Sequence, residues 1–126
     1  MDEKRCVLSH TYLGNIYLGV QYPRCKDISK ALMHYKRYME LEPKEPLAYY
    51  NYGYALYEAE QYGEAIQNLE KHSGLEKDIY AKYYLGLAYC KSGQLERGRK
   101  VLRGVADEDE EMLDEEAKAF LGKEEK

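Results

Sequence analysis

Apolar and polar residues recur along this chain at helical spacing, and they distinguish two kinds of segment. Residues 46–59 carry two apolar stripes on neighbouring faces. One stripe comprises Leu47, Tyr50, Tyr54 and Tyr57, and the other Tyr49, Tyr52, Gly53 and Leu56. Residues 62–73 carry a single narrow stripe of Ala65, Ile66 and Leu69. A helix that is apolar on several sides must contact several neighbours. We therefore expect 46–59, and the similar segment 78–91, to be inner helices, with outer helices between them.

Turn signals divide the chain at regular intervals and predict an all-α fold. They include Tyr22-Pro23, Pro43 to Pro46, Tyr62-Gly63, Ser73-Gly74 and Ser92-Gly93. Between them lie six segments of helical length, followed by a seventh. We expect helices near 4–20, 27–41, 46–59, 62–73, 78–91, 94–105 and 109–121.

One short sequence motif, which we call the repeated phrase, occurs three times. Leu13-Gly14-x-x-Tyr17 recurs as Tyr52-Gly53-x-x-Leu56 and as Leu85-Gly86-x-x-Tyr89, so the glycines stand 39 and then 33 residues apart. A period of about 34 residues is typical of stacked helical hairpins, none of which can bury its apolar face alone. Glycine inside a helix costs about 1 kcal/mol relative to alanine, so its repetition predicts close approach of a neighbouring helix. Such a solenoid usually binds other molecules and seldom catalyses a reaction.

Composition limits the number of domains, the class of partner and the cellular location that we expect for this fold. The chain has 126 residues, which suits one domain spanning 1–126, and its net charge of −4 argues against nucleic acid as a partner. Its uncharged runs are interrupted by polar residues, so we expect no membrane insertion and no signal peptide. The three cysteines have no metal-like spacing and favour a reducing, cytoplasmic location.

The repeated phrase and its flanking residues resemble a tetratricopeptide repeat. The resemblance rests on Leu13-Gly14-x-x-Tyr17 with Ala31, Tyr35 and Pro43, on Tyr49-x-x-Tyr52-Gly53-x-x-Leu56 with Ala65 and Leu69, and on Leu85-Gly86-x-x-Tyr89 with Gly98 and Leu102. It implies an α-α superhelix of antiparallel helix pairs, with repeats at about 6–43, 46–77 and 79–107 and a capping helix at about 109–121. The first helix of each pair would line a concave face.

The first repeat departs from this pattern by an insertion around 22–27 that is similar to the longer loop of the Sel-type variant. The loop carries Arg24, Cys25 and Lys26, and is either a contact element or a tolerated surface insertion.

The best-known proteins of this kind bind a carboxylate at a partner's C-terminus through two asparagines and several basic residues. Asn15 and Asn51 match the asparagines, but Thr11 replaces an expected lysine, and Tyr80 and Tyr84 replace a basic pair. Two asparagines cannot neutralise a desolvated carboxylate. We therefore expect no docking of heat-shock chaperone tails.

Tyrosine is the residue that replaces the missing bases. Fifteen residues are tyrosine, against one phenylalanine and no tryptophan. The predicted peptide-binding residues are Tyr12, Asn15, Tyr50, Asn51, Tyr54, Tyr57, Tyr80, Tyr83, Tyr84 and Leu87. Tyrosine offers a large amphipathic contact area at a modest entropic cost, although such rings also pack between neighbouring inner helices.

The sequence thus predicts a protein–protein interaction module, an adaptor or chaperone-like protein that binds a peptide or helical segment of a partner in a tyrosine-rich groove. The alternative is a structural assembly module that self-associates through its exposed aromatic surface.

We expect no enzyme, no cofactor and no metal site. Cys6 and His10 lack a third ligand nearby, and neither a phosphate-binding loop nor a nucleophile elbow is visible. The acidic run Asp107–Glu116 admits two interpretations, either acids that favour a helix start or an acidic docking surface.

Overall fold

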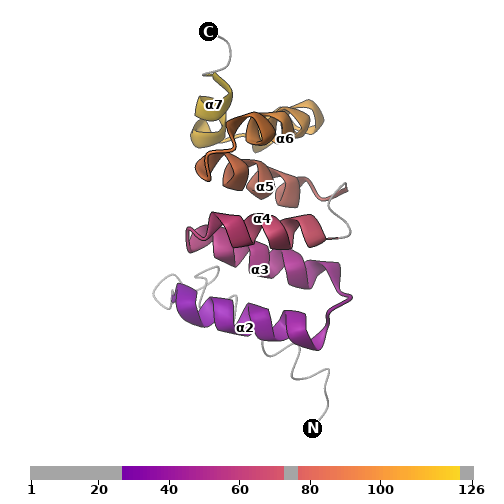
Figure 1. Ribbon diagram of the computed structural model, residues 1–126. Coiled ribbons are helices and arrows are strands. Elements are labelled where there is room, and N and C mark those ends of the chain that lie inside the picture. The colour runs from indigo at the N-terminus through magenta and orange to yellow at the C-terminus, as the bar shows by residue number, and fades with distance from the viewer. Residues whose placement is uncertain (1–26, 73–76, 123–126) are drawn as a thin grey trace.

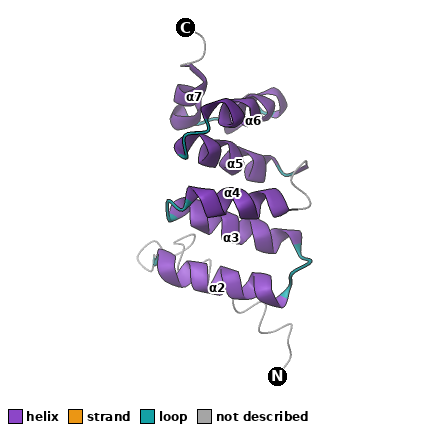
Figure 2. Cartoon of the chain, viewed as in Figure 1, coloured by secondary structure: helices purple, strands orange, loops and turns teal. Residues whose placement is uncertain are grey.

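The computed structural model describes residues 27–72 and 77–122, and these form a column of stacked helices (Figure 1). In chain order the helices are α2 (Ile28–Leu41), α3 (Pro46–Glu58), α4 (Tyr62–Lys71), α5 (Ile79–Lys91), α6 (Leu95–Glu108), the short 3₁₀ turn η3 (Glu110–Met112) and α7 (Glu115–Gly122). Successive long helices run antiparallel, and no strand occurs within the two described ranges (Figure 2). The fold is an all-α, α-α superhelix, as the sequence predicts. The expected first helix near 4–20 and the insertion at 22–26 lie outside the described residues.

Aspartates fix the starts of three helices. The Asp27 side chain accepts a hydrogen bond from the Lys30 N–H at 3.1 Å and caps α2. Asp78 caps α5 through the Ala81 N–H at 3.1 Å, and Asp114 accepts from the Ala117 N–H at 2.9 Å at the start of α7. Each carboxylate satisfies an amide that has no partner within its own helix.

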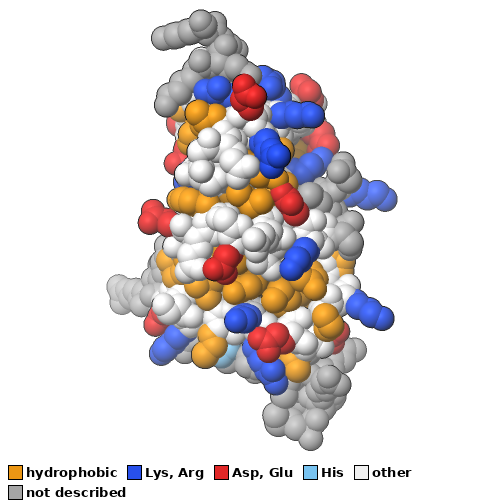
Figure 3. All heavy atoms as spheres, in the orientation of Figure 1, with side chains coloured by type: hydrophobic (Ala, Val, Ile, Leu, Met, Phe, Trp, Pro, Cys, Tyr) orange, Lys and Arg blue, Asp and Glu red, His pale blue; other side chains and the backbone are white. Residues whose placement is uncertain are grey.

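The inner helices bury several faces and the outer helices bury one, as the apolar pattern predicts. In α5 eight side chains or glycines are buried, and in α3 five are. By contrast, α6 buries only Gly98, Leu102 and Val105, which lie on one stripe. The surface view in Figure 3 shows apolar side chains in bands between the helices, with charged side chains of both signs scattered among them.

The repeated glycines allow neighbouring helices to approach closely. A methyl group built at Gly53 would lie 2.8 Å from the Leu69 side chain, and one at Gly86 would lie 2.9 Å from Leu102. At Gly98 the same methyl would meet the Gly86 carbonyl oxygen at 2.7 Å. The close packing expected from the phrase is therefore present at α3–α4 and α5–α6, and at Gly53 and Gly86 the contacting residue is a leucine.

The segment expected as one helix at 109–121 is divided in the structure. Helix α6 continues to Glu108, η3 follows, and α7 begins only after Asp114. Leu113 lies in extended backbone between them and is buried against the core, which interrupts the helix. The helix-start interpretation of the acidic run is thus wrong for Asp107 and Glu108, which end α6, and correct for Glu115 and Glu116 in the first turn of α7.

None of the helices within the described ranges has both the length and the apolar character needed to cross a bilayer.

Candidate functional site

Tyrosines of α3 and α5 form one continuous surface, which we call the tyrosine face. It comprises Tyr50, Tyr54 and Tyr57 of α3 and Tyr80, Tyr83 and Tyr84 of α5. The i, i+3 and i+4 spacings within each helix place these side chains on the sides of α3 and α5 that meet.

Ring contacts join the two helices. Tyr54 meets Tyr84 edge to face with ring centroids 4.5 Å apart, and Tyr57 lies 5.4 Å from the same ring. Tyr83 contacts Tyr84 at 5.2 Å, and Tyr50 stacks on Tyr54 at 6.4 Å. Tyr84 is therefore the centre of the face, and edge-to-face contacts of this kind stabilise an aromatic cluster beyond the effect of burial alone.

The predicted binding residues differ in how far they reach solvent. Tyr80 is 58% exposed, whereas Tyr50, Asn51, Tyr54 and Tyr84 are half-buried. Tyr57 and Tyr83 are buried, and Leu87 is only 1% exposed. These three residues form the floor of the face, so a ligand in this conformation contacts mainly the others. Tyr12 and Asn15 lie outside the described residues.

Burial raises the pKa of Tyr50, Tyr54 and Tyr84 above the ordinary value of a tyrosine hydroxyl. Desolvation raises the pKa of Tyr50, and it also raises that of Tyr84. For Tyr54, burial together with the neighbouring Tyr84 and Glu58 raises the pKa. These three side chains therefore present neutral hydroxyls that donate and accept hydrogen bonds.

A pocket of about 400 Å³ opens where the tyrosine face reaches the C-terminal end of α3. We call it the acidic pocket. Its lining comprises Tyr57, Glu58, Glu60, Tyr62, Tyr83, Tyr84, Leu87, Lys91, Asp114 and Glu116. Helices α3, α4, α5 and α7 all contribute to it, so the pocket depends on the capping helix.

The ammonium group of Lys91 lies inside this aromatic lining. Its Nζ donates to the Tyr57 hydroxyl at 2.8 Å and pairs with Glu116 Oε1 at 3.0 Å. It also lies 4.7 Å from the Tyr57 ring centroid and 5.8 Å from that of Tyr62, within cation–π range. Burial lowers the pKa of Lys91, but the hydrogen bonds to Tyr57 and Glu116 outweigh burial and raise the pKa.

Asp114, at the start of α7, accepts a hydrogen bond from Tyr83 of the tyrosine face. Partial burial raises the pKa of its carboxyl, but hydrogen bonds from the Ala117 N–H and the Tyr83 hydroxyl outweigh this and lower it. The carboxylate is therefore ionised near neutral pH. It both caps α7 and accepts a hydrogen bond from the buried Tyr83.

Glu60 lies at the rim of the pocket in an unusual backbone conformation. It closes the turn between α3 and α4 with φ of 62°, in the left-handed region. The corresponding turn between α5 and α6 has the same hydrogen-bond pattern and places Gly93 there, with φ of 94°. The glutamate thus occupies a position where glycine is favoured, at a cost of about 1 kcal/mol.

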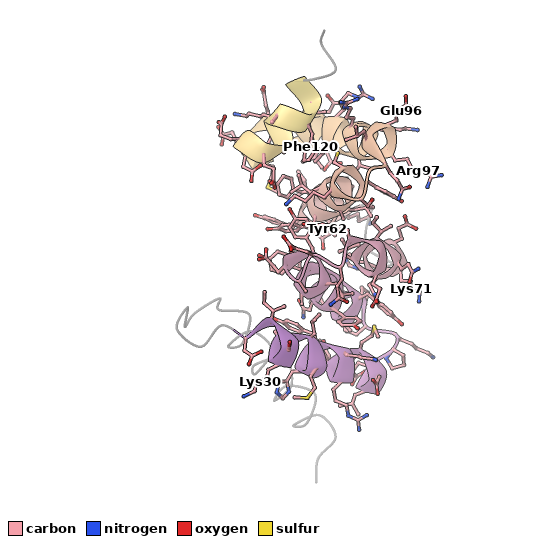
Figure 4. All side chains as sticks on the ribbon, turned by 60° about the vertical axis from the view of Figure 1, so that its left-hand side comes forward. Lys30, Tyr62, Lys71, Glu96, Arg97 and Phe120 are labelled. Carbon is pink, nitrogen blue, oxygen red and sulfur yellow. The ribbon has the colours of Figure 1, made fainter. Side chains whose placement is uncertain are left out.

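A second hollow, of about 490 Å³, lies between α5 and α6 on the opposite side of α5. We call it the outer cleft. It is lined by Lys82, Leu85, Tyr89, Arg97, Lys100, Val101, Gly104 and Glu108. Lys82 Nζ and Glu108 Oε1 are 2.5 Å apart, and the Tyr89 hydroxyl donates to Glu70. In Figure 4, Arg97 lies at the right-hand edge of the stack, whereas Tyr62 lies between the helices.

Sequence reasoning missed the charged half of the site. Glu58, Glu60, Lys91 and Asp114 were not predicted, nor was Tyr62. Asp114 and Glu116 both belong to the acidic run. The interpretation of that run as a docking surface is therefore the one sequence signal that could have pointed to the carboxylates. Nothing in the linear sequence indicates that α7 brings these carboxylates to the end of α3.

Within residues 27–72 and 77–122 there is no cluster of three His, Cys, Asp or Glu side chains arranged to hold a metal ion. His72 is buried and its Nε2 lies 2.9 Å from Asp78 Oδ2, a contact between α4 and the start of α5.

Solved structures similar to this chain are helical repeat domains. The Arabidopsis OM64 TPR domain has a TM-score of 0.78 and 17% identity, and the match covers 97% of this chain and 96% of that one. The second TPR domain of human RPAP3, in complex with HSP70 peptide SGPTIEEVD, has a TM-score of 0.75 at 18% identity, with 99% of both chains covered. MamA 41-end from Desulfovibrio magneticus RS-1 has a TM-score of 0.73 and 27% identity, and the match covers 96% of this chain and 63% of that chain.

No curated protein matches the chain. The family described as anaphase-promoting complex, cyclosome, subunit 3, matches residues 24–105, more than half of the sequence. Together with the stacked helix pairs and the packing of Gly53 and Gly86, this match shows that the chain belongs to that family and is a tetratricopeptide repeat protein.

Proposed function

We propose that this protein is an interaction module that binds a peptide segment of a partner protein along the tyrosine face. Peptide binding by a similar domain supports the proposal, since the second TPR domain of human RPAP3 was solved in complex with an HSP70 peptide. The proposal itself rests on the surface of this chain.

The observation that carries it is the exposure of large side chains on and beside the tyrosine face. Leu47 is 53% exposed on α3 and Tyr80 is 58% exposed on α5. Leu47 lies one helical turn before Tyr50, and Tyr80 one turn before Tyr84, so both extend the face toward the N-terminal ends of the helices. Large apolar side chains that adjoin a partly buried aromatic cluster are typical of a binding surface.

The chemistry of the face suits a peptide. The half-buried Tyr54 and Tyr84 offer rigid rings for apolar side chains, and their hydroxyls remain protonated. Asn51 lies on the same helix and is also half-buried. An amide and several hydroxyls can satisfy the backbone groups of an extended chain, while the rings hold its side chains.

The partner segment differs from an acidic C-terminal tail. The HSP70 peptide bound by the RPAP3 domain ends in Glu-Glu-Val-Asp. In this chain the C-terminal end of the tyrosine face carries Glu58, Glu60, Asp114 and Glu116. These carboxylates would repel such a tail, which agrees with the presence of Tyr80 and Tyr84 where a basic pair is expected.

Selection from a random peptide library displayed on mRNA tests the proposal with the full chain as bait. We expect a family of peptides to be enriched and to bind at least about tenfold more weakly to the Leu47→Ala/Tyr80→Ala variant. Both side chains are more than half exposed, so thermal unfolding should remain near that of the wild type. Met33→Ala is the matched control, because Met33 is 57% exposed on α2, away from the face. Equal binding to wild type and the double variant would refute the proposal.

The alternative of self-association has a separate readout. Light scattering over a range of protein concentrations gives the mass of the particle. A monomer throughout leaves the tyrosine face available to a partner. A dimer that dissociates in the Leu47→Ala/Tyr80→Ala variant would instead assign the face to a second copy of the chain.

A further inference from the structure

We propose that the acidic pocket receives a lysine or arginine side chain of the bound peptide. This inference rests on the proposed function and specifies the chemistry of the partner. The peptide that fits has apolar side chains at one end and a basic side chain at the other.

The balance of charge in the pocket favours a cation. Among the described residues, four carboxylates line it, from Glu58, Glu60, Asp114 and Glu116, and Lys91 is the one basic residue of that lining. Glu58 is partly buried beside the four tyrosine rings of the lining, whereas Glu60, Asp114 and Glu116 are exposed. Near such low-dielectric walls the attraction for a positive charge is stronger than in bulk water.

The pocket already holds one ammonium group, that of Lys91. That group combines three contacts: a 2.8 Å hydrogen bond to the Tyr57 hydroxyl, a 3.0 Å ion pair with Glu116 and cation–π contact with the Tyr57 ring. Lys91 is satisfied mainly by Tyr57 and Glu116. Glu58, whose carboxylate accepts a hydrogen bond from the Tyr54 hydroxyl, and Glu60 in the turn after α3 would meet a second cation together with the ring of Tyr84.

The spacing along α3 fixes the length of the occupant. Leu47 and Glu58 are separated by eleven residues of sequence, so they lie about 16 Å apart along the helix axis. An extended peptide covers that span in roughly five residues. We therefore expect an apolar anchor near Leu47 and Tyr80 and a basic residue roughly five positions away.

The backbone at Glu60 supports a role for this carboxylate. The equivalent turn of the following repeat uses glycine at the left-handed position, whereas here a glutamate stands there at the rim of the pocket. Strained residues of this kind gather at functional sites. In this chain the substitution adds a negative charge where the peptide's basic side chain would lie.

The experiment uses the same random nonapeptide library with two baits, the wild-type chain and the Glu58→Gln/Glu60→Gln variant. Glutamine keeps the size of each side chain and removes its charge, so folding should be unaffected. We expect the wild-type pool to be enriched in lysine or arginine at a fixed distance from apolar residues. Individual arginine peptides should bind the variant about tenfold more weakly, and added salt should weaken their binding to wild type. Glu64→Gln on α4 is the matched control, and its pool should equal that of the wild type.

Each outcome decides the inference. Peptides that are enriched without basic residues, or basic peptides that bind the variant as tightly as wild type, overturn it and leave the proposed function standing. A library from which the wild-type chain enriches nothing contradicts both. A basic pool that depends on Glu58 and Glu60 supports both.

Discussion

The two hollows on opposite sides of α5 have similar volumes, about 400 Å³ for the acidic pocket and about 490 Å³ for the outer cleft, but opposite charge. The acidic pocket combines four carboxylates with tyrosine rings. The outer cleft combines Lys82, Arg97 and Lys100 with apolar side chains, and Lys82 is already paired with Glu108. Neighbouring residues of α5 thus line the acidic pocket on one side of the helix and the outer cleft on the other. Size therefore does not identify a binding site in this fold, whereas the chemistry of the lining does.

Disruption of the close packing between α5 and α6 should have the largest effect on stability. A methyl group at Gly98 would meet the Gly86 carbonyl oxygen at 2.7 Å and the Cys90 nitrogen at 2.8 Å. Both are backbone atoms and cannot rotate away, so we predict that Gly98→Ala lowers the free energy of unfolding by about 3 kcal/mol. Chemical denaturation measures this loss.

Gly104→Ala on the same helix is the control for that substitution. A methyl group there would meet nothing within 4 Å. Alanine favours the helix, so we expect a gain of up to about 1 kcal/mol in the free energy of unfolding. Equal effects at the two glycines would contradict the close approach of α5 and α6 at Gly98.

Alkaline pH should destabilise the tyrosine-rich interior next. Burial raises the pKa of Tyr35 to about 12. A pKa raised in the folded state contributes stability that is complete below the unfolded value near 10 and is lost as the pH rises through the folded value. We predict a loss of about 2 kcal/mol from Tyr35 alone between pH 10 and pH 12.

Thermal unfolding followed together with tyrosinate absorbance measures this effect. Buried tyrosines should ionise together with unfolding, and Tyr35→Phe should reduce the pH dependence. Ionisation of every tyrosine near pH 10 without loss of helix would contradict the burial described for Tyr35.

Substitutions in the turns before α4 and α6 should change stability by smaller amounts and in opposite directions. Glu60→Gly should raise the free energy of unfolding by about 1 kcal/mol, because glycine accepts a positive φ without strain. Gly93→Ala at the equivalent turn should lower it by a similar amount. Denaturation curves measure both changes, and the Glu60→Gly variant should also lose affinity for basic peptides. A gain in stability with unchanged binding would remove Glu60 from the site.

The sequence was sufficient for the five helices from α2 to α6 and their order. Helix α3 was expected at 46–59 and spans Pro46–Glu58, and α5 was expected at 78–91 and spans Ile79–Lys91. These boundaries were predictable because proline, Asp78 and the Ser92-Gly93 turn act locally. The break at Leu113 was not predictable, since it depends on burial of that side chain against other helices.

The candidate site was predictable only in its aromatic half. Helical spacing places Tyr54 and Tyr84 on one concave face, either open to a peptide or packed between the inner helices; in the structure both are half-buried and their rings are in contact. Two carboxylates of the acidic pocket, Glu58 and Glu60, come from the end of α3 and the turn after it, whereas Asp114 and Glu116 come from the start of α7, far from α3 in the sequence. Their convergence is a property of the stacked fold, and no periodic pattern in the sequence encodes it.

The most direct test of the account is the affinity of one display-selected basic peptide for two charge-reversal variants, one on each side of α5. Glu58→Lys reverses a charge in the acidic pocket, and Lys100→Glu reverses one in the outer cleft. The account predicts that Glu58→Lys weakens binding by at least about tenfold and that Lys100→Glu changes it by less than about twofold. Loss of binding in Lys100→Glu with full binding in Glu58→Lys would contradict it and place the partner in the outer cleft.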